Sequence, residues 1–264
     1  MAERSLATRR SLVAVLIAVF GFLYIPIAVL VALSFNEGGL PTVWTGFSVK
    51  WYGALLANHE ILSAALNTLI VAVVSTIMAT ILGTLLALGM EIRRRKGRAI
   101  EALAFAPMII PDIVLAIALL SFFSLLGVTM GLHTIILSHV IFNLAFVCSV
   151  VRARLKSFDW SVTEASADLG ASGWTTFRRV TLPLILPAVI AGALLAFTLS
   201  VDEFIISFFT SGAGRSSTTL PMQIYAMIRF GVTPEINALA TLVMIVSVTA
   251  LTLSQRLNRG VIGA

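Results

Sequence analysis

Charged residues are scarce in this chain: Asp, Glu, Lys and Arg make up 11% of its 264 residues, whereas hydrophobic residues make up 59%. An ordinary soluble domain carries about 25% charged residues. The composition therefore excludes a typical soluble protein and indicates a chain surrounded largely by membrane lipid. The net charge of +6 is no sign of nucleic-acid binding, because the basic residues fall in the connections between apolar segments.

Residues that carry catalytic or metal chemistry are also few. The single cysteine, Cys148, lies in an apolar run and excludes an intramolecular disulfide. The three histidines are widely separated and form neither H-E-x-x-H nor any other metal-ligand spacing, and G-x-S-x-G is absent. We therefore expect no catalytic residue, no metal site and no membrane enzyme.

A nucleotide-binding loop is missing as well. None of the lysines that could serve it, Lys50, Lys96 and Lys156, lies in the pattern G-x-x-x-x-G-K-[ST] that cradles phosphates. The chain is therefore expected to bind no cofactor and to hydrolyse no ATP itself.

Long apolar blocks dominate what is present. Each is about 20 residues long, enough to cross a hydrocarbon core of about 30 Å as a helix. The first block lacks an A-x-A cleavage site and is interpreted as a retained span rather than a signal peptide. We predict an all-α polytopic membrane protein with six transmembrane helices and a cytoplasmic helical hairpin. The predicted spans are 12–33, 66–89, 102–126, 132–151, 184–206 and 236–254.

The basic residues orient these spans. Of the 18 Lys and Arg residues, all but Lys50, Arg215 and Arg229 lie before the first span, after the last, or in the second-to-third and fourth-to-fifth connections. Loops rich in Lys and Arg face the cytoplasm. Both termini and the loop that contains Glu164 are therefore expected on the cytoplasmic side.

Between the fourth and fifth predicted spans lies a polar segment with signals for two short helices. Ser161 and Glu164 have capping-box spacing, which predicts a helix that starts near Val162. Gly170 can end it in the left-handed conformation, and Ser172 can cap a second helix. Pro183 is expected to stop the second helix near Leu182.

This hairpin resembles the EAA loop of ABC importer permeases, which docks on a separate ATPase subunit. Ser166 stands where the family usually has a second alanine. The matching positions are Glu164, Ala165, Gly170, Phe177, Leu182 and Pro183, continued by Pro187, Gly192, Phe197 and Thr198. The resemblance implies the type I ABC importer permease fold, with residues 1–264 as one transmembrane domain and 157–183 as the coupling hairpin. The ATPase-coupling residues it implies are Glu164, Ala165, Ser166, Asp168 and Gly170.

Ionisable side chains inside predicted spans are candidates for a substrate path, because charge in hydrocarbon is costly. Asp112 is expected about 15 Å deep in a straight third span, and Asp202 and Glu203 near the outer end of the fifth. We favour Asp202, since Thr198 lies one turn below it; Glu203 could instead pair with Arg215 or Arg229. His139 and Asn143 could bond to Asp112. For all of these side chains, pairing that merely holds the bundle together is the alternative.

A second resemblance concerns the cargo. Several segments resemble the spermidine/putrescine permease subunits of polyamine importers: 34–36, 51–52, 108–114, 200–206, 219–221 and 231–241. The resemblance implies a bacterial cytoplasmic (inner) membrane and a heterodimer with a homologous second permease. It also implies two ATPase subunits that bind ATP and Mg, and a soluble periplasmic or extracellular substrate-binding protein.

Two alternatives stay open. The same class of importer could carry an opine, 4-aminobutyrate or another amino-acid derivative. A stand-alone channel or secondary transporter is less favoured, because the sequence shows no internal repeat of the kind that builds many secondary transporters.

Overall fold

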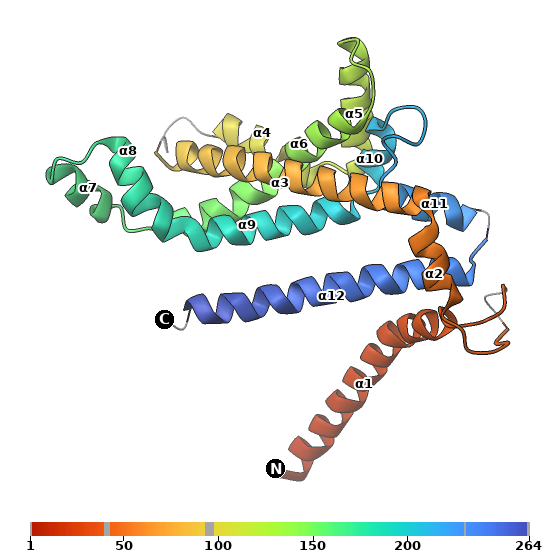
Figure 1. Ribbon diagram of the computed structural model, residues 1–264. Helices are drawn as coiled ribbons and strands as arrows, with labels where there is room; N and C mark the ends of the chain where they lie inside the picture. Colours follow the sequence, from red (N-terminus) through yellow and green to blue (C-terminus); the bar gives the residue numbers. More distant parts are fainter. Residues whose placement is uncertain (1, 40–42, 93–97, 230, 263–264) are drawn as a thin grey trace. The chain divides into compact units, whose positions relative to one another are not determined.

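The computed structural model describes residues 2–39, 43–92, 98–229 and 231–262 (Figure 1). In these residues the structure is helical, and an isolated antiparallel bridge joins Asn36 to Phe47. The prediction of an all-α fold is confirmed. The basic connection formed by residues 93–96 lies outside the described residues. The chain divides into two compact units, Met1–Leu62 with Ile224–Ala264, and Ser63–Gln223.

The first unit is built around α1 (Ala2–Leu33), α2 (Lys50–Ala57) and α12 (Pro234–Ile262), with α12 packed against the other two. The loop between α1 and α2 is organised by Asn36, which is fully buried. Its side-chain Nδ2 donates to the Val43 carbonyl at 2.7 Å, and its side-chain Oδ1 accepts from the Thr45 N–H at 2.9 Å. Its backbone carbonyl accepts from the Trp51 Nε1–H at 2.8 Å. Asn36 therefore holds the two described parts of this loop together.

The second unit holds most of the helices. They are α3 (His59–Ile92, whose first turn belongs to the first unit), α4 (Arg98–Ile109), α5 (Asp112–Leu125), α6 (Leu132–Lys156), α7 (Ser161–Asp168), α8 (Gly173–Thr176), the π-helical turn η1 (Phe177–Thr181), α9 (Leu182–Asp202), α10 (Ile205–Thr210) and the start of α11 (Leu220–Arg229). The pairs α6–α9, α5–α10 and α4–α6 pack against each other.

Small residues let α3, α6 and α9 approach closely around Val147, which is fully buried. A Cβ atom on Gly83 of α3 would lie 2.9 Å from the Val147 Cβ and 3.0 Å from the Leu144 carbonyl oxygen. A Cβ on Gly192 of α9 would lie 3.4 Å from the Val147 Cα. Helix interfaces in membranes rely on such small residues for close packing.

Gly83→Leu should therefore destabilise the protein, by about 1–3 kcal/mol or more, the usual cost of overpacking a core. The backbone oxygen of Leu144 cannot yield as a flexible side chain would. Gly89→Leu is the matched control, because it lies on the same helix with open space around its Cβ position. Thermal unfolding of the purified protein in detergent measures the difference, and equal melting temperatures for the two variants would contradict the packing.

Among the described residues, four helices are long and apolar enough to cross a membrane: Leu12–Leu33, His59–Ile92, Leu132–Lys156 and Gly173–Asp202. They correspond to the first, second, fourth and fifth predicted spans. The helices Glu101–Ile109 and Asp112–Leu125 would form one more span if counted together, and the apolar helix Pro234–Val246 is shorter. The count of six spans therefore stays a prediction.

The prediction of a straight third span is wrong. The chain bends by 115° between Ile109 and Asp112. Pro111 explains the break, because it lacks an N–H and disfavours the helical conformation of Ile110 before it. Asp112 therefore begins a helix instead of lying ten residues into one. The fifth predicted span, 184–206, likewise ends early at Asp202.

The prediction that Pro183 stops the second helix near Leu182 is wrong. Residues Gly173–Asp202 form one continuous helical path (Figure 1). Within the π turn η1 the Leu182 N–H bonds to the Phe177 carbonyl, five residues back. This shift puts Pro183 into the first turn of α9, where a missing N–H is tolerated.

Candidate functional site

The hairpin begins with α7, one residue before its predicted start. Ser161 is the first helical residue, and the predicted Ser161 cap is wrong: the Ser161 N–H donates instead to Asp159 Oδ1 at 3.0 Å. The Ser161 side chain and N–H both donate to the Asp159 carboxylate and hold the pKa of Asp159 below its ordinary value. Asp159 therefore takes the role that the sequence assigned to Ser161.

The end of α7 follows the prediction. Gly170 has a φ of +83°, a conformation that costs little only for glycine. The Gly170 N–H bonds to the Ala167 carbonyl at 2.8 Å, and the Ala171 N–H bonds to the Ser166 carbonyl at 3.1 Å. These two bonds form a Schellman motif, which turns the chain sharply towards α8.

The second arm of the hairpin is fixed by side-chain hydroxyls. Ser172 caps α8 as predicted, because its Oγ accepts from the Thr175 N–H at 3.3 Å. Ser166 Oγ lies 3.0 Å from Thr176 Oγ1, which ties α7 to α8. No pattern in the sequence predicts this last contact.

The outer side of the hairpin carries the predicted coupling residues. Glu164, Ala165, Asp168 and Gly170 are exposed, and Ser166 is half-buried. Large apolar side chains stand among them: Leu169 is 89% exposed and Trp174 is 69% exposed. Exposed apolar groups beside polar ones are typical of a surface that contacts another protein.

A second candidate site lies at two helix breaks that the packing of α5 on α10 brings together. Asp112 is the first residue of α5, where the positive end of the helix dipole stabilises a carboxylate. Glu203 lies in the break between α9 and α10, and its Oε1 accepts from the Ile206 N–H at 2.9 Å. The two half-buried carboxylates interact electrostatically.

The other candidates for the path have different surroundings. Asp202 is the last residue of α9 and is exposed. Thr198 is exposed too, and its hydroxyl donates to the Leu194 carbonyl at 2.9 Å. Asn143 is fully buried, and its side-chain amide finds no hydrogen-bond partner among the described residues.

His139 does not bond to Asp112. Its Nδ1 lies 2.7 Å from Ser200 Oγ and its Nε2 lies 2.9 Å from Ser207 Oγ, so both ring nitrogens are used. Ser200 Oγ also lies 3.1 Å from Ser75 Oγ. We call Ser75, Ser200, His139 and Ser207 the hydroxyl–imidazole chain; it joins α3, α9, α6 and α10.

The direction of each hydrogen bond in the hydroxyl–imidazole chain follows from the bond that Ser207 makes at its end. The Ser207 hydroxyl donates to the Glu203 carbonyl at 3.0 Å, so its oxygen accepts from His139. Nε2 therefore carries the ring proton, and Nδ1 accepts from Ser200. The chain fixes the position of Glu203 at the helix break.

His139→Ala should destabilise the protein by about 2–4 kcal/mol, since it opens a cavity and removes two buried hydrogen bonds. His133→Ala is the control, because His133 is exposed on the same helix. Thermal unfolding in detergent distinguishes the two. A His139→Ala protein as stable as the control would show that the hydroxyl–imidazole chain has no structural role.

Comparison with known proteins decides the family. Residues 79–260 match the family described as "Binding-protein-dependent transport system inner membrane component". The chain belongs to this family. The permease is therefore an inner-membrane transport component, and the resemblance to ABC importer permeases is confirmed.

Two relatives from Escherichia coli (strain K12) are similar over most of their length. The permease is 42% identical to the "Spermidine/putrescine transport system permease protein PotC", over 92% of this chain and 91% of that protein. It is 43% identical to the "Putrescine transport system permease protein PotI", over 88% of this chain and 85% of that protein.

The fold also matches solved structures. A chain of a bacterial ABC transporter involved in the import of the acidic polysaccharide alginate superposes with a TM-score of 0.75 at 18% identity, over 96% of this chain and 97% of that one. A chain of the MetNI methionine ABC transporter, in an inward-facing conformation, gives a TM-score of 0.62 at 19% identity, over 81% of this chain and 99% of that one. These likenesses confirm the predicted permease fold.

Proposed function

We propose that the permease forms half of the membrane path of an ATP-driven importer for polyamines, putrescine and spermidine. The observation that carries the proposal is its identity of 42–43% to two relatives whose names specify these cations, over about nine-tenths of the chain. An alginate or methionine cargo does not follow from the solved structures, because at 18–19% identity they share the fold only.

The acids at the helix breaks suit such a cargo. A polyamine carries several positive charges. Transfer of these charges out of water costs free energy, which nearby carboxylates can offset. Asp112 and Glu203 offer two negative charges close together, and Asp202 adds a third next to Glu203. Membrane potential assists a cation moving inward, by about 2.3 kcal/mol per charge per 100 mV.

ATP hydrolysis by the partner subunits would act on the permease through the hairpin 157–183. In the proposed topology both termini and the hairpin 157–183 are cytoplasmic, and the exposed face with Glu164, Leu169 and Trp174 docks on an ATPase subunit that binds ATP and Mg. A homologous second permease completes the path, a second ATPase completes the motor, and a soluble binding protein delivers the cargo.

The continuous helix Gly173–Asp202 connects the two candidate sites. Its 30 residues span about 45 Å at 1.5 Å per residue. One end carries the second arm of the hairpin, and the other end carries Asp202. Movement of the hairpin when the ATPases close would therefore reach the acids through a single helix, and not across a flexible joint at Pro183.

The test is ATP hydrolysis by the reconstituted complex with its binding protein, in the presence of putrescine, spermidine, 4-aminobutyrate or an opine. Stimulation by a polyamine is the expected result. Stimulation by 4-aminobutyrate or an opine alone would keep the importer and change its cargo. No cargo-dependent hydrolysis by the intact complex would favour a stand-alone channel or secondary transporter.

A further inference from the structure

A groove between α4 and α6 is not used by the proposed transport function. Its cavity has a volume of about 610 Å³. One side is lined by Glu101, Phe105, Met108 and Ile109 of α4, and the other by residues of α6 that include Arg152 and Lys156. We call this cavity the α4–α6 groove.

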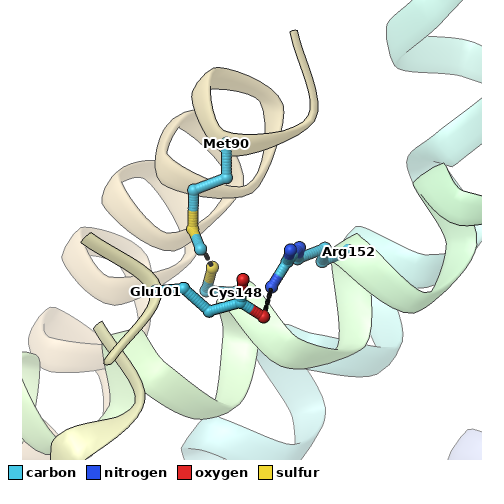
Figure 2. A network of polar contacts seen from close by, with 4 residues as sticks. All are labelled: Met90, Glu101, Cys148 and Arg152. Carbon is cyan, nitrogen blue, oxygen red and sulfur yellow. Dashed lines mark hydrogen bonds and ion pairs between the residues drawn. The ribbon is translucent and has the colours of Figure 1, made fainter. Parts of the chain in front are cut away.

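The polar end of the groove is positively charged. Arg152 Nη1 donates to Glu101 Oε1 at 2.6 Å (Figure 2). The Arg152 guanidinium also lies over the Phe105 ring, at 5.8 Å from its centroid. This ion pair neutralises Glu101. Lys156, which is exposed at the end of α6, leaves the residues that line the groove with one net positive charge; Glu91 also interacts with Arg152 but does not line the groove. The exposed Lys156 ammonium is therefore available to an anionic group.

The other end of the groove is apolar and open to the surroundings. Met108 is 41% exposed and Ile109 is 80% exposed. A free phosphate ion gains nothing from contact with these apolar side chains. An acyl chain is stabilised by them, since each buried CH₂ contributes about 0.8 kcal/mol.

The depth of the groove agrees with a lipid. α6 has 25 residues and is about 37 Å long, whereas the hydrocarbon core is about 30 Å thick. Its last turn, with Lys156, therefore reaches the headgroup layer, while Met108 and Ile109 extend towards the hydrocarbon. Basic pockets between transmembrane helices on the cytoplasmic side are suited to anionic headgroups.

We propose that the α4–α6 groove binds an anionic phospholipid, with its phosphate at Lys156 and Arg152 and an acyl chain along Phe105, Met108 and Ile109. The choice of leaflet rests on the cytoplasmic placement of this end of α6 in the proposed function. A bound lipid would fill the space between α4 and α6. It would thereby stabilise the position of α4 before the bend at Pro111.

The experiment is native mass spectrometry of the complete importer complex, released from bilayers that contain dioleoylphosphatidylglycerol and dioleoylphosphatidylcholine. We expect the complex to retain phosphatidylglycerol in preference. Lys156→Gln should reduce that retention about fivefold, the factor that corresponds to about 1 kcal/mol of attraction per lysine. Arg154→Gln is the matched control: it removes the same charge from the same turn, but Arg154 donates towards the Leu184 carbonyl at 3.4 Å and does not line the groove.

Three results would overturn the proposal. Equal loss of lipid in both variants would show that general surface charge is sufficient. Displacement of the lipid by inorganic phosphate would assign the site to a free anion. Ala153 lines the groove, so an Ala153→Cys variant that crosslinks to the second permease in the assembled complex would place protein in the groove. Binding is measured without ATP or cargo, so failure here and failure of the polyamine proposal are separate outcomes.

Discussion

Gly170→Arg is expected to abolish substrate-stimulated ATP hydrolysis while the protein still inserts and assembles. Gly170 has a φ of +83°, and a non-glycine residue in this conformation costs about 1–2 kcal/mol. Nothing lies within 4 Å of its Cβ position, so the new side chain would project from the proposed docking face. Strain alone would weaken docking about tenfold, and the added cation would block it further. Hydrolysis by the reconstituted complex, with and without cargo, measures the effect.

Two smaller substitutions separate strain from bulk. Gly170→Ala introduces the strain without the long side chain and should reduce coupling partially. Gly173→Ala is the control, because Gly173 lies in the same hairpin with open space at its Cβ position and without a positive φ. Normal cargo-stimulated hydrolysis in Gly170→Arg would refute the docking role of the hairpin.

Glu203→Gln should reduce polyamine uptake by about tenfold or more, since removing the carboxylate from a charge pair with a cargo ammonium group costs about 2 kcal/mol or more. The glutamine amide oxygen can still accept from the Ile206 N–H, so the cap of α10 is retained and only the charge is lost. Asp202→Asn should act in the same direction, because Asp202 is exposed at the end of α9 and its carboxylate is available to a cation. Uptake of radiolabelled putrescine into proteoliposomes is the measurement.

Glu37→Gln serves as the control for this pair, because it removes an exposed acid from the loop after α1. Complex assembly should be unchanged in all three variants. Wild-type uptake in both Glu203→Gln and Asp202→Asn would make these acids structural, as the alternative from the sequence holds. Failure of Glu203→Gln to assemble would show that its charge, and not only its cap, maintains the break.

Local chemistry accounts for what the sequence predicted well. The turn at Gly170 and the cap at Ser172 depend on residues within a few positions of each other, and the structure has both. The start of α7 near Val162 is predicted correctly, but its capping residue is not, because Asp159 offers a stronger acceptor than the Ser161 hydroxyl and lies just outside the pattern. The effect of Pro183 depended on a π turn that no sequence pattern announced.

Contacts between segments far apart in the chain could not be predicted from a single sequence. Ser200 and Ser207 lie 61 and 68 residues from His139, so a single sequence could suggest only that His139 was buried and polar. The break at Asp112 is a different case. Pro111 stood beside it and indicated the bend, but a long apolar run was interpreted as one straight helix.

The hydroxyl–imidazole chain has a consequence for energy conservation. An imidazole buried in a membrane protein is a potential carrier of protons, and a proton leak would dissipate the gradient that the cell maintains. Here the row of donors ends at the Glu203 carbonyl oxygen, which has no proton to pass on. Ser75, Ser200, His139 and Ser207 therefore brace four helices with polar groups and still form a dead end for proton conduction.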